Sequence, residues 1–327
     1  MRTSKAVEVR SPGKVILVGE HFVVHGGNAV ALAIDRYTRL RILSAKKGEI
    51  ELVFPDKGAK ATYGPSTGWE GNVSREVTRP IHQTLDAVFE WCGAKDRIKL
   101  QIEYGFPVSA GLGSSASLAA AIVRGVSAYL GAELGQGDLL ELASSYERIV
   151  HGNPSGIDLQ TVSGGGLVLF EGASRSVAER THGVDLSLVV ADSGERRSTG
   201  DLVSRVTEVK DSHPQLFSAL MKINDTLIGT SWEALREGDL ETLGRMFQVS
   251  QGLLYSLGVS TPLLDQAVHR ARDSGALGAK LTGAGGGGCI IAVPGSSVSR
   301  VETSLKEISP ECMVVHPDRR GVVVVGE

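Results

Sequence analysis

The chain has 327 residues, of which 42% are hydrophobic and 22% charged, and its formal net charge is -3. This composition is ordinary for a globular protein of one large or two medium domains, and the charge balance provides no basic field for nucleic acid. No apolar signal segment, membrane-length apolar run or cysteine cluster is visible. We therefore expect a cytoplasmic protein with no membrane segment and no nucleic-acid partner.

The first half of the chain opens with a group of short β-branched runs and continues with amphipathic stretches. The apolar spacing predicts helices over 73–93, 115–131 and 137–152, with Pro80 at a helix start or a kink. Strands bounded by Gly, Pro or Asp are expected at residues 6–10, 14–19, 29–35, 38–44, 49–54, 97–106, 165–172 and 185–194.

The second half is richer in helix. A spacing of 3.6 residues predicts helices over 199–211, 214–239, 240–258, 261–275 and 296–309. Strands are expected at 277–283, 287–294, 311–317 and 321–327. Because strands and helices are grouped and do not alternate regularly, the pattern favours an α+β fold.

Glycine is over-represented, with 41 residues, and it is clustered. The stretch PVSAGLGSSAS, residues 107–117, directly precedes an apolar helix. One interpretation is a serine cap on that helix, and the other is an anion site made by the free N–H groups of the first turn. A dinucleotide fingerprint is disfavoured because Pro107 prevents an immediate strand-to-helix turn, and no Walker motif occurs. The loop alone leaves the first two interpretations open.

Three motifs together resemble those of the GHMP kinases, the family of galactokinase, homoserine kinase, mevalonate kinase and phosphomevalonate kinase. They are SPGKVILVGEHFVVHGG at 11–27, the loop at 107–117, and KLTGAGGGGC at 280–289. The resemblance spans nearly the whole chain. It implies a two-domain α+β fold, with a ribosomal-protein-S5-like domain at 1–175 that carries the ATP-binding loop. A ferredoxin-like α/β sandwich would follow at 176–327, with the active site in the cleft between them.

Further motifs resemble the members of the family that phosphorylate mevalonate. They are GEHFVVHGG at 19–27, HGNPSGID at 151–158 and RRSTGDLV at 196–203, with Phe22, His25 and Asn153 departing from the usual residues. The resemblance implies transfer of phosphate from ATP, with Mg²⁺, to the primary 5-hydroxyl of mevalonate, in isoprenoid precursor synthesis. A homodimer is one assembly to be tested. The alternatives are a phosphomevalonate or homoserine kinase, or a ligand sensor without catalysis.

The resemblance also implies a role for each candidate residue. Asp158 would accept or position the proton of the attacking hydroxyl, and Lys14 beside it would offset the charge of the transition state. Glu147 and Ser115 would ligate magnesium, with Ser114 the weaker candidate. From the residues alone, Asp158 could equally cap a helix or turn, Lys14 could end a solvated strand, and Glu147 could form a surface ion pair.

Two further groups are implied for the ligands. The ATP phosphates would lie against Pro107, Ser109, Ala110, Gly111, Leu112, Gly113, Ser114, Ser115, Ala116, Ala284, Gly285 and Gly286. The acid substrate would contact Lys14, Glu20, His21, Asp158, Arg197, Thr199 and Gly283. A lone histidine such as His21 is more often structural, so this assignment also depends on the resemblance.

Overall fold

The computed structural model describes residues 6–196 and 199–326. Its larger sheet has the strand order β13-β1-β2-β6-β3-β4-β5, and β7 joins β2 to β8 on a side branch. All pairings are antiparallel except that of β3 with β6. The strands are β1 (Val7–Val18), β2 (Ala29–Ser44), β3 (Ile50–Phe54), β4 (Ala59–Gly64), β5 (Gly68–Gly71), β6 (Ile98–Tyr104), β7 (Leu167–Glu171), β8 (Ser176–Thr181) and β13 (Val323–Val324).

Two long strands replace four predicted short ones at the centre of this sheet. β1 runs through Pro12 and Gly13, where its register against β2 shifts. A bulge of this kind bends a strand without ending it, so a proline and a glycine are tolerated there. The bend places Lys14 directly after the bulge, in the buried half of β1.

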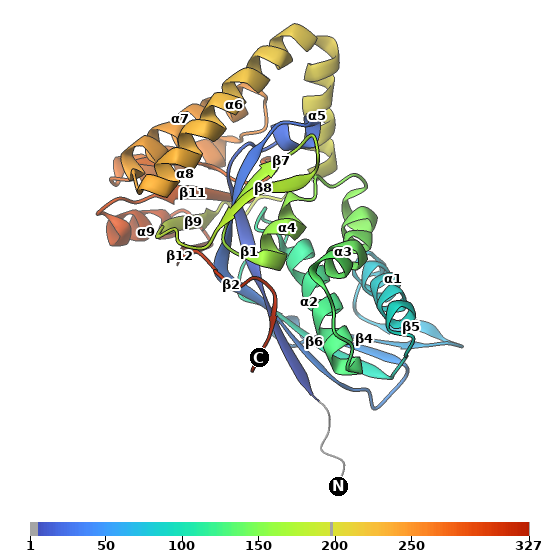
Figure 1. The fold of residues 1–327 in the computed structure, drawn as a ribbon. Coiled ribbons are helices and arrows are strands. Elements are labelled where there is room, and N and C mark those ends of the chain that lie inside the picture. Colours follow the sequence, from blue (N-terminus) through green and yellow to red (C-terminus); the bar gives the residue numbers. More distant parts are fainter. Residues whose placement is uncertain (1–5, 197–198, 327) are drawn as a thin grey trace.

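Four helices cover one face of the larger sheet (Figure 1): α1 (Arg75–Cys92), α2 (Ser114–Leu130), α3 (Gln136–His151) and α4 (Ile157–Gly164). Apolar side chains of α1 and α2, including Leu85 and Ile122, pack there against Leu40 and Leu100 of the sheet. Pro80 lies inside α1, near its N-terminal end, where a proline removes only one helical hydrogen bond. The short helix α4 was not predicted.

The smaller sheet is antiparallel, with the order β10-β11-β9-β12. Its strands are β9 (Leu188–Asp192), β10 (Gly278–Leu281), β11 (Cys289–Val293) and β12 (Glu311–Val315). Helices α5 (Thr199–Ser212), α6 (Pro214–Glu237), α7 (Leu240–Ser256), α8 (Pro262–Asp273) and α9 (Val298–Lys306) belong to this half (Figure 1). None of the helices that the structure describes is both long and apolar enough to cross a membrane.

The two sheets share a continuous apolar core. Leu17 and Leu32 of the larger sheet belong to the same buried cluster as Val190 and Ile291 of the smaller one. The α+β class is therefore confirmed. The division at residue 175 stays a prediction, because β8 and the C-terminal β13 both pair with strands of the first sheet.

Candidate functional site

Lys14 and Asp158 form the centre of the candidate site. Lys14 Nζ lies 2.9 Å from Asp158 Oδ1, and the side chains are 3% and 32% exposed. The same ammonium donates to the Gly111 carbonyl at 3.1 Å, while the Lys14 backbone N–H donates to the Leu112 carbonyl. Asp158 stands in the first turn of α4, and Lys14 on β1. The Asp158 carboxylate is thus partly open to solvent, while the Lys14 ammonium that pairs with it is held by the glycine loop.

The glycine loop ends at the N-terminus of α2. Gly113 is the N-cap residue, with a φ of 74°, and no side chain caps the helix. A serine cap is therefore not what this loop provides. The first helical turn carries no acidic residue, and its N–H groups have no preceding carbonyl in the helix. The arrangement is suited to an anion, because the helix dipole places partial positive charge at the same end.

The glycine loop at 107–117, the first glycine loop, packs against the loop that follows β10. A Cβ on Gly111, whose φ is +86°, would lie 2.8 Å from the Thr282 carbonyl oxygen, and one on Gly283 would lie 3.0 Å from Gly111 Cα. The Cys289 N–H also donates to the Ala110 carbonyl at 3.1 Å. Only glycines permit this approach of two backbones, so the second and third sequence motifs meet in the structure.

Ala284, Gly285 and Gly286, the predicted centre of the third glycine motif, contact other parts of the chain. The Gly286 N–H donates to the Val259 carbonyl, and a Cβ on Gly285 would lie 2.2 Å from the same oxygen. Ala284 uses its carbonyl for His21. These three residues therefore link the loop to the connection between α7 and α8 and to the N-terminal motif, while Gly283 makes the contact with the first glycine loop.

Ser115 and Glu147 lie next to the catalytic candidates. The Ser115 hydroxyl is 2.9 Å from His151 Nε2. Burial raises the pKa of Glu147 to about 7, a hydrogen bond from Ser115 opposes this, and the charge of Asp158 adds to it. Glu147 is 4% exposed, and its Oε1 has no hydrogen-bond partner. Glu147 is therefore buried, and it forms no surface ion pair with any of the described residues.

A magnesium ion fits this oxygen-rich corner. A hydroxyl and a carboxylate with an unpartnered oxygen are hard ligands, and magnesium often takes only one or two ligands from protein. Over the described ranges, no group of three or more His, Cys, Asp or Glu side chains is arranged to hold a metal. Ser114 is turned to other use, because its hydroxyl accepts from the Ser109 N–H at 3.4 Å.

Glu20 and His21 follow β1 and are both buried. Glu20 forms an ion pair with Lys280 of β10, and its second oxygen has no partner. His21 has a φ of 63°, and its Nε2 lies 2.8 Å from the Ala284 carbonyl oxygen. Burial lowers the pKa of His21, and a carbonyl can only accept, so the neutral ring donates from Nε2 and Nδ1 is left as an acceptor.

The last predicted substrate contacts lie where little is described. Arg197 is outside the described residues, and Thr199 opens α5 without a described side chain. The neighbouring Arg196 is held by Asp192, with nitrogen–oxygen distances of 2.8 and 2.6 Å. Arg196 thereby stands at the rim of a cavity of about 320 Å³.

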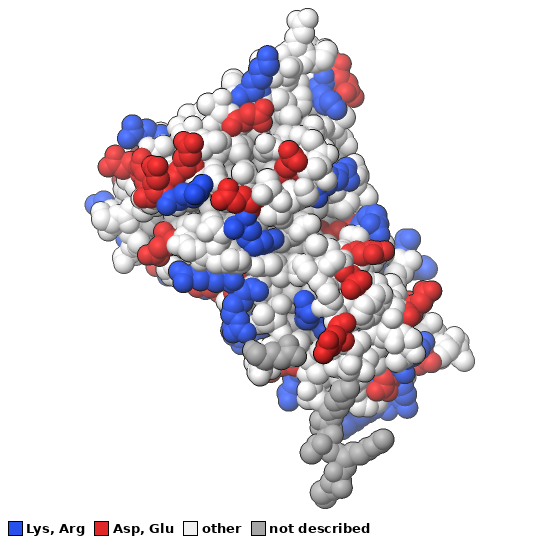
Figure 2. All heavy atoms as spheres, in the orientation of Figure 1, with Lys and Arg blue, Asp and Glu red and all other residues white. Residues whose placement is uncertain are grey.

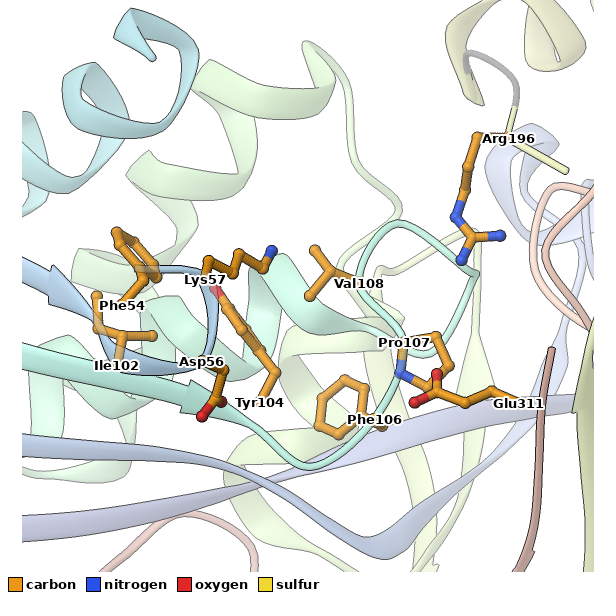
Figure 3. A pocket seen from close by; sticks show the side chains of 10 residues that line it. All are labelled: Phe54, Asp56, Lys57, Ile102, Tyr104, Phe106, Pro107, Val108, Arg196 and Glu311. Atoms are coloured by element: carbon orange, nitrogen blue, oxygen red, sulfur yellow. The ribbon is translucent and has the colours of Figure 1, made fainter. Parts of the chain in front are cut away.

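This cavity lies immediately before the glycine loop (Figure 3). Phe54, Tyr104 and Phe106 provide aromatic walls, and Lys57 Nζ lies 5.7 Å from the centre of the Tyr104 ring. Pro107 continues the wall toward the loop. Because the lining contains neither Lys14 nor Asp158, this cavity is not the place of the reacting atoms. Its aromatic walls suit a flat, partly apolar group, and its position beside Pro107 would let that group be attached to an anion on the glycine loop.

Sequence reasoning missed several residues of this site. His151 belongs to the motif HGNPSGID and Lys280 to KLTGAGGGGC, but neither residue is assigned a role from the sequence. For Lys280 a signal was present, because a lysine within a short apolar strand is unusual. Thr282 was also missed, and its hydroxyl bonds both the N–H and the carbonyl of Ile16 at 3.0 Å. Arg196 was passed over for Arg197. The cavity residues Phe54 and Tyr104 carried no local signal.

Two family models match the chain: "GHMP kinases N terminal domain" over residues 79–166 and "GHMP kinases C terminal" over residues 232–310. With the paired glycine loops, they define the class. The chain belongs to the GHMP kinase family, and the predicted family and its two-domain fold are confirmed.

Within the family, the chain is similar to several mevalonate kinases. The chain is 37% identical to the mevalonate kinase of Aeropyrum pernix, with 88% of each chain covered, and 32% identical to that of Pyrococcus horikoshii, with 97% of each covered. The solved mevalonate kinase of Methanococcus jannaschii matches with a TM-score of 0.79 at 25% identity, covering 97% of this chain and 99% of that one. The L. major mevalonate kinase in complex with R-mevalonate matches with a TM-score of 0.78 at 26% identity, covering 98% and 97%.

Proposed function

We propose that the protein transfers the terminal phosphate of ATP to the primary 5-hydroxyl of mevalonate. The observation that carries the proposal is the Lys14–Asp158 pair, at 2.9 Å, beside the uncapped N-terminus of α2. A carboxylate, an ammonium and free N–H groups together meet the needs of phosphoryl transfer, which are alignment and neutralisation of charge. The mevalonate kinases among the relatives support mevalonate as the acceptor.

In this proposal Asp158 takes or positions the proton of the attacking hydroxyl, because its open side can face substrate. Lys14 Nζ holds the Asp158 carboxylate at 2.9 Å, and its charge offsets the negative charge that develops on the transferred group. Since Gly111 and Asp158 both bind the ammonium, Lys14 is oriented before any ligand arrives.

The nucleotide would occupy the first glycine loop and the cavity before it. The phosphates would lie on residues 107–116 and against residues 284–286, with the adenine in the cavity lined by Tyr104 and Phe106. ATP bound there supplies the phosphoryl group, and magnesium held by Glu147 and Ser115 would supply charge to neutralise it. Ser115 is the better ligand than Ser114, because the Ser114 hydroxyl accepts from the Ser109 N–H within the loop, whereas Ser115 is the serine whose interaction contributes to the pKa of Glu147.

The acid substrate would lie beside Glu20 and His21, with Arg197, Thr199 and Gly283 completing the pocket. Neutral His21 offers an acceptor at Nδ1, and Glu20 offers its unpartnered oxygen. Both are suited to hydroxyl donors. Positive charge for the carboxylate would come from Arg197.

A substrate panel tests the function. We expect ADP release with ATP, magnesium and mevalonate, and a phosphorus NMR spectrum of the product that places phosphate on the primary carbon. Phosphomevalonate, homoserine and no acceptor serve as the other arms. A strong rate with one of these acceptors and none with mevalonate would assign another kinase activity of the family, whereas mevalonate binding without turnover would indicate a sensor.

Solution behaviour completes the proposal. We place the protein in the cytoplasm with small molecules as its ligands, and propose a homodimer from the family resemblance, to be tested by sedimentation. On the face in Figure 2, basic and acidic side chains are intermixed, so this face presents no surface of one sign for nucleic acid.

A further inference from the structure

A buried ion pair joins the two sheets behind the candidate substrate pocket. Lys280 on β10 is 0% exposed and Glu20 is 1% exposed, and they are 260 positions apart in the chain. The Lys280 ammonium also donates to the Leu281 carbonyl at 2.6 Å and lies 5.8 Å from the centre of the Phe247 ring. No other carboxylate pairs with it among the described residues.

Stability alone is a weak reason for such a pair. Removing two charges from water is costly, and apolar replacements of similar volume are often as stable or more stable. The position of the pair is more informative. Lys280, Thr282 and Ala284 occupy alternate positions, and they bind Glu20, Ile16 and His21 in turn. Alternate residues of the third glycine motif are thereby bound to the C-terminal end of β1 and to the two residues Glu20 and His21 that follow it.

His21 needs this attachment. Its φ of 63° lies in the left-handed region, which a residue with a side chain occupies only at a cost in free energy. The conformation is held from both sides: by the Ala284 carbonyl on the imidazole and by Lys280 on the preceding carboxylate. With one oxygen of Glu20 bound to Lys280, the other stays free for a donor.

We propose that Lys280 is a positioning residue for the acid substrate: it orients Glu20, and through Glu20 the backbone and imidazole of His21. This inference depends on the proposed function, since it names the substrate side of the same site. In the proposed function most contacts to the ATP phosphates come from residues 107–116 at the N-terminus of α2, so ATP binding should depend on Lys280 much less than mevalonate binding does.

The test is the Lys280→Met variant, with KM measured separately for mevalonate and ATP and with mevalonate binding measured by calorimetry without nucleotide. We expect KM and Kd for mevalonate to rise roughly tenfold, a common size for coupling between contacting groups, while KM for ATP stays within about twofold. Lys306→Met is the matched control, because Lys306 pairs with Glu302 in an exposed helix of the same half. It should change neither constant.

The double variant Glu20→Gln, Lys280→Met separates positioning from folding. It leaves no unpaired buried charge, so its melting temperature should lie closer to the parent than that of Lys280→Met, yet mevalonate should still bind weakly. Parental mevalonate binding in either variant, or an equal loss for both ligands, would overturn the proposal. If the single variant does not fold, Lys280→Gln, which leaves Glu20 unchanged and offers it a neutral hydrogen-bond donor, carries the test with the same expected loss of mevalonate binding and the same unchanged KM for ATP. If the parent acts on another acceptor, the function fails separately, and the same comparison is made with that acceptor.

Discussion

Asp158 is the residue on which the proposed chemistry most depends. Asp158→Asn keeps the shape of the side chain and removes the proton acceptor, so kcat should fall by roughly two to four orders of magnitude. KM for both substrates should change little, because ground-state contacts remain. Buried Lys14 loses its carboxylate partner, so the melting temperature should also fall. Steady-state kinetics and a melting curve measure both effects.

Asp225→Ala, an exposed change on α6, controls for the handling of the variants. A folded Asp158→Asn enzyme within about threefold of the parent kcat would remove Asp158 from the mechanism.

Glu147 should make the ligand-free protein less stable as the pH rises. Its pKa of about 7 in the folded protein exceeds the ordinary 4.5, chiefly because the carboxyl is buried. The folded state therefore binds the proton more tightly. This contribution to stability is complete below pH 4.5 and is lost as the pH passes through about 7, for a total of up to roughly 3 kcal/mol. Urea unfolding at pH 5 and pH 8 measures it.

Glu147→Gln should remove most of that difference and be more stable than the parent at pH 8. Equal pH dependence in parent and variant would show that Glu147 does not hold its proton in the folded state.

The magnesium requirement should also follow Glu147 and Ser115. Glu147→Gln removes a charged ligand, so the magnesium concentration for half-maximal rate should rise, and Ser115→Ala should act more mildly because it removes a neutral ligand. A magnesium titration at saturating ATP measures both. Asp225→Ala, the exposed change on α6, is again the control. An unchanged requirement in the first two variants would take magnesium away from this corner.

At the scale of elements, the two glycine loops act as one unit. Gly111→Ala should destabilise the protein by roughly 2–4 kcal/mol, since it combines a left-handed backbone with a Cβ 2.8 Å from the Thr282 oxygen. Activity should fall with it, because the loops separate. Gly131→Ala is the control. Its φ is +83°, but nothing lies within 4 Å of the added Cβ.

Gly131→Ala should therefore lose only about 1–2 kcal/mol and keep its activity. Chemical denaturation and ADP release compare the two variants. If they were equally destabilised and equally active, the contact between the loops would be unimportant.

Most of these elements were predictable from local patterns. The 3.6-residue spacing located α1 and α3 because each buries one face, whereas α2 is buried nearly all round and was visible as a long apolar run. β4, β5, β8 and α4 were missed. The burial pattern of β8 shows why: no residue of Ser176–Thr181 is fully buried, so its sequence has no apolar periodicity to detect. Its strand conformation comes from pairing with β7.

At the scale of the whole molecule, the C-terminal segment ties the two sheets together. After β12 it returns to the larger sheet, where Asp318 accepts from the Gly321 N–H at 2.7 Å and from the Tyr37 hydroxyl at 2.9 Å. Asp318→Ala should destabilise the protein by roughly 2–3 kcal/mol. Amides of this segment, such as Val322 and Val325, should exchange hydrogen faster.

A second measurement follows Tyr37 in the same variant. Burial, helped by Asp318, raises the pKa of Tyr37 to about 12, so the Asp318→Ala change should lower it toward the ordinary 10. Ultraviolet titration against the Asp225→Ala control measures this. Unchanged exchange and an unchanged tyrosine titration would mean that the segment is held by its backbone bonds alone.

The sequence by itself determined the α+β class, most helices and strands, and the three glycine motifs with their charged companions. These features are local: amphipathic spacing follows from which face is buried, and glycine marks backbones that no side chain permits. It also carried the family resemblance, because all three motifs stand in order along one chain.

Only the tertiary structure decided which of these residues meet. Lys280 reaches Glu20, Thr282 reaches Ile16, and the Ser115 hydroxyl turns to His151. None of these contacts is encoded by spacing along the chain, because each depends on where one packed element comes to lie against another. The raised pKa of Glu147 has the same origin: a carboxylate on a helix becomes a weak acid only when the neighbouring elements exclude water from it.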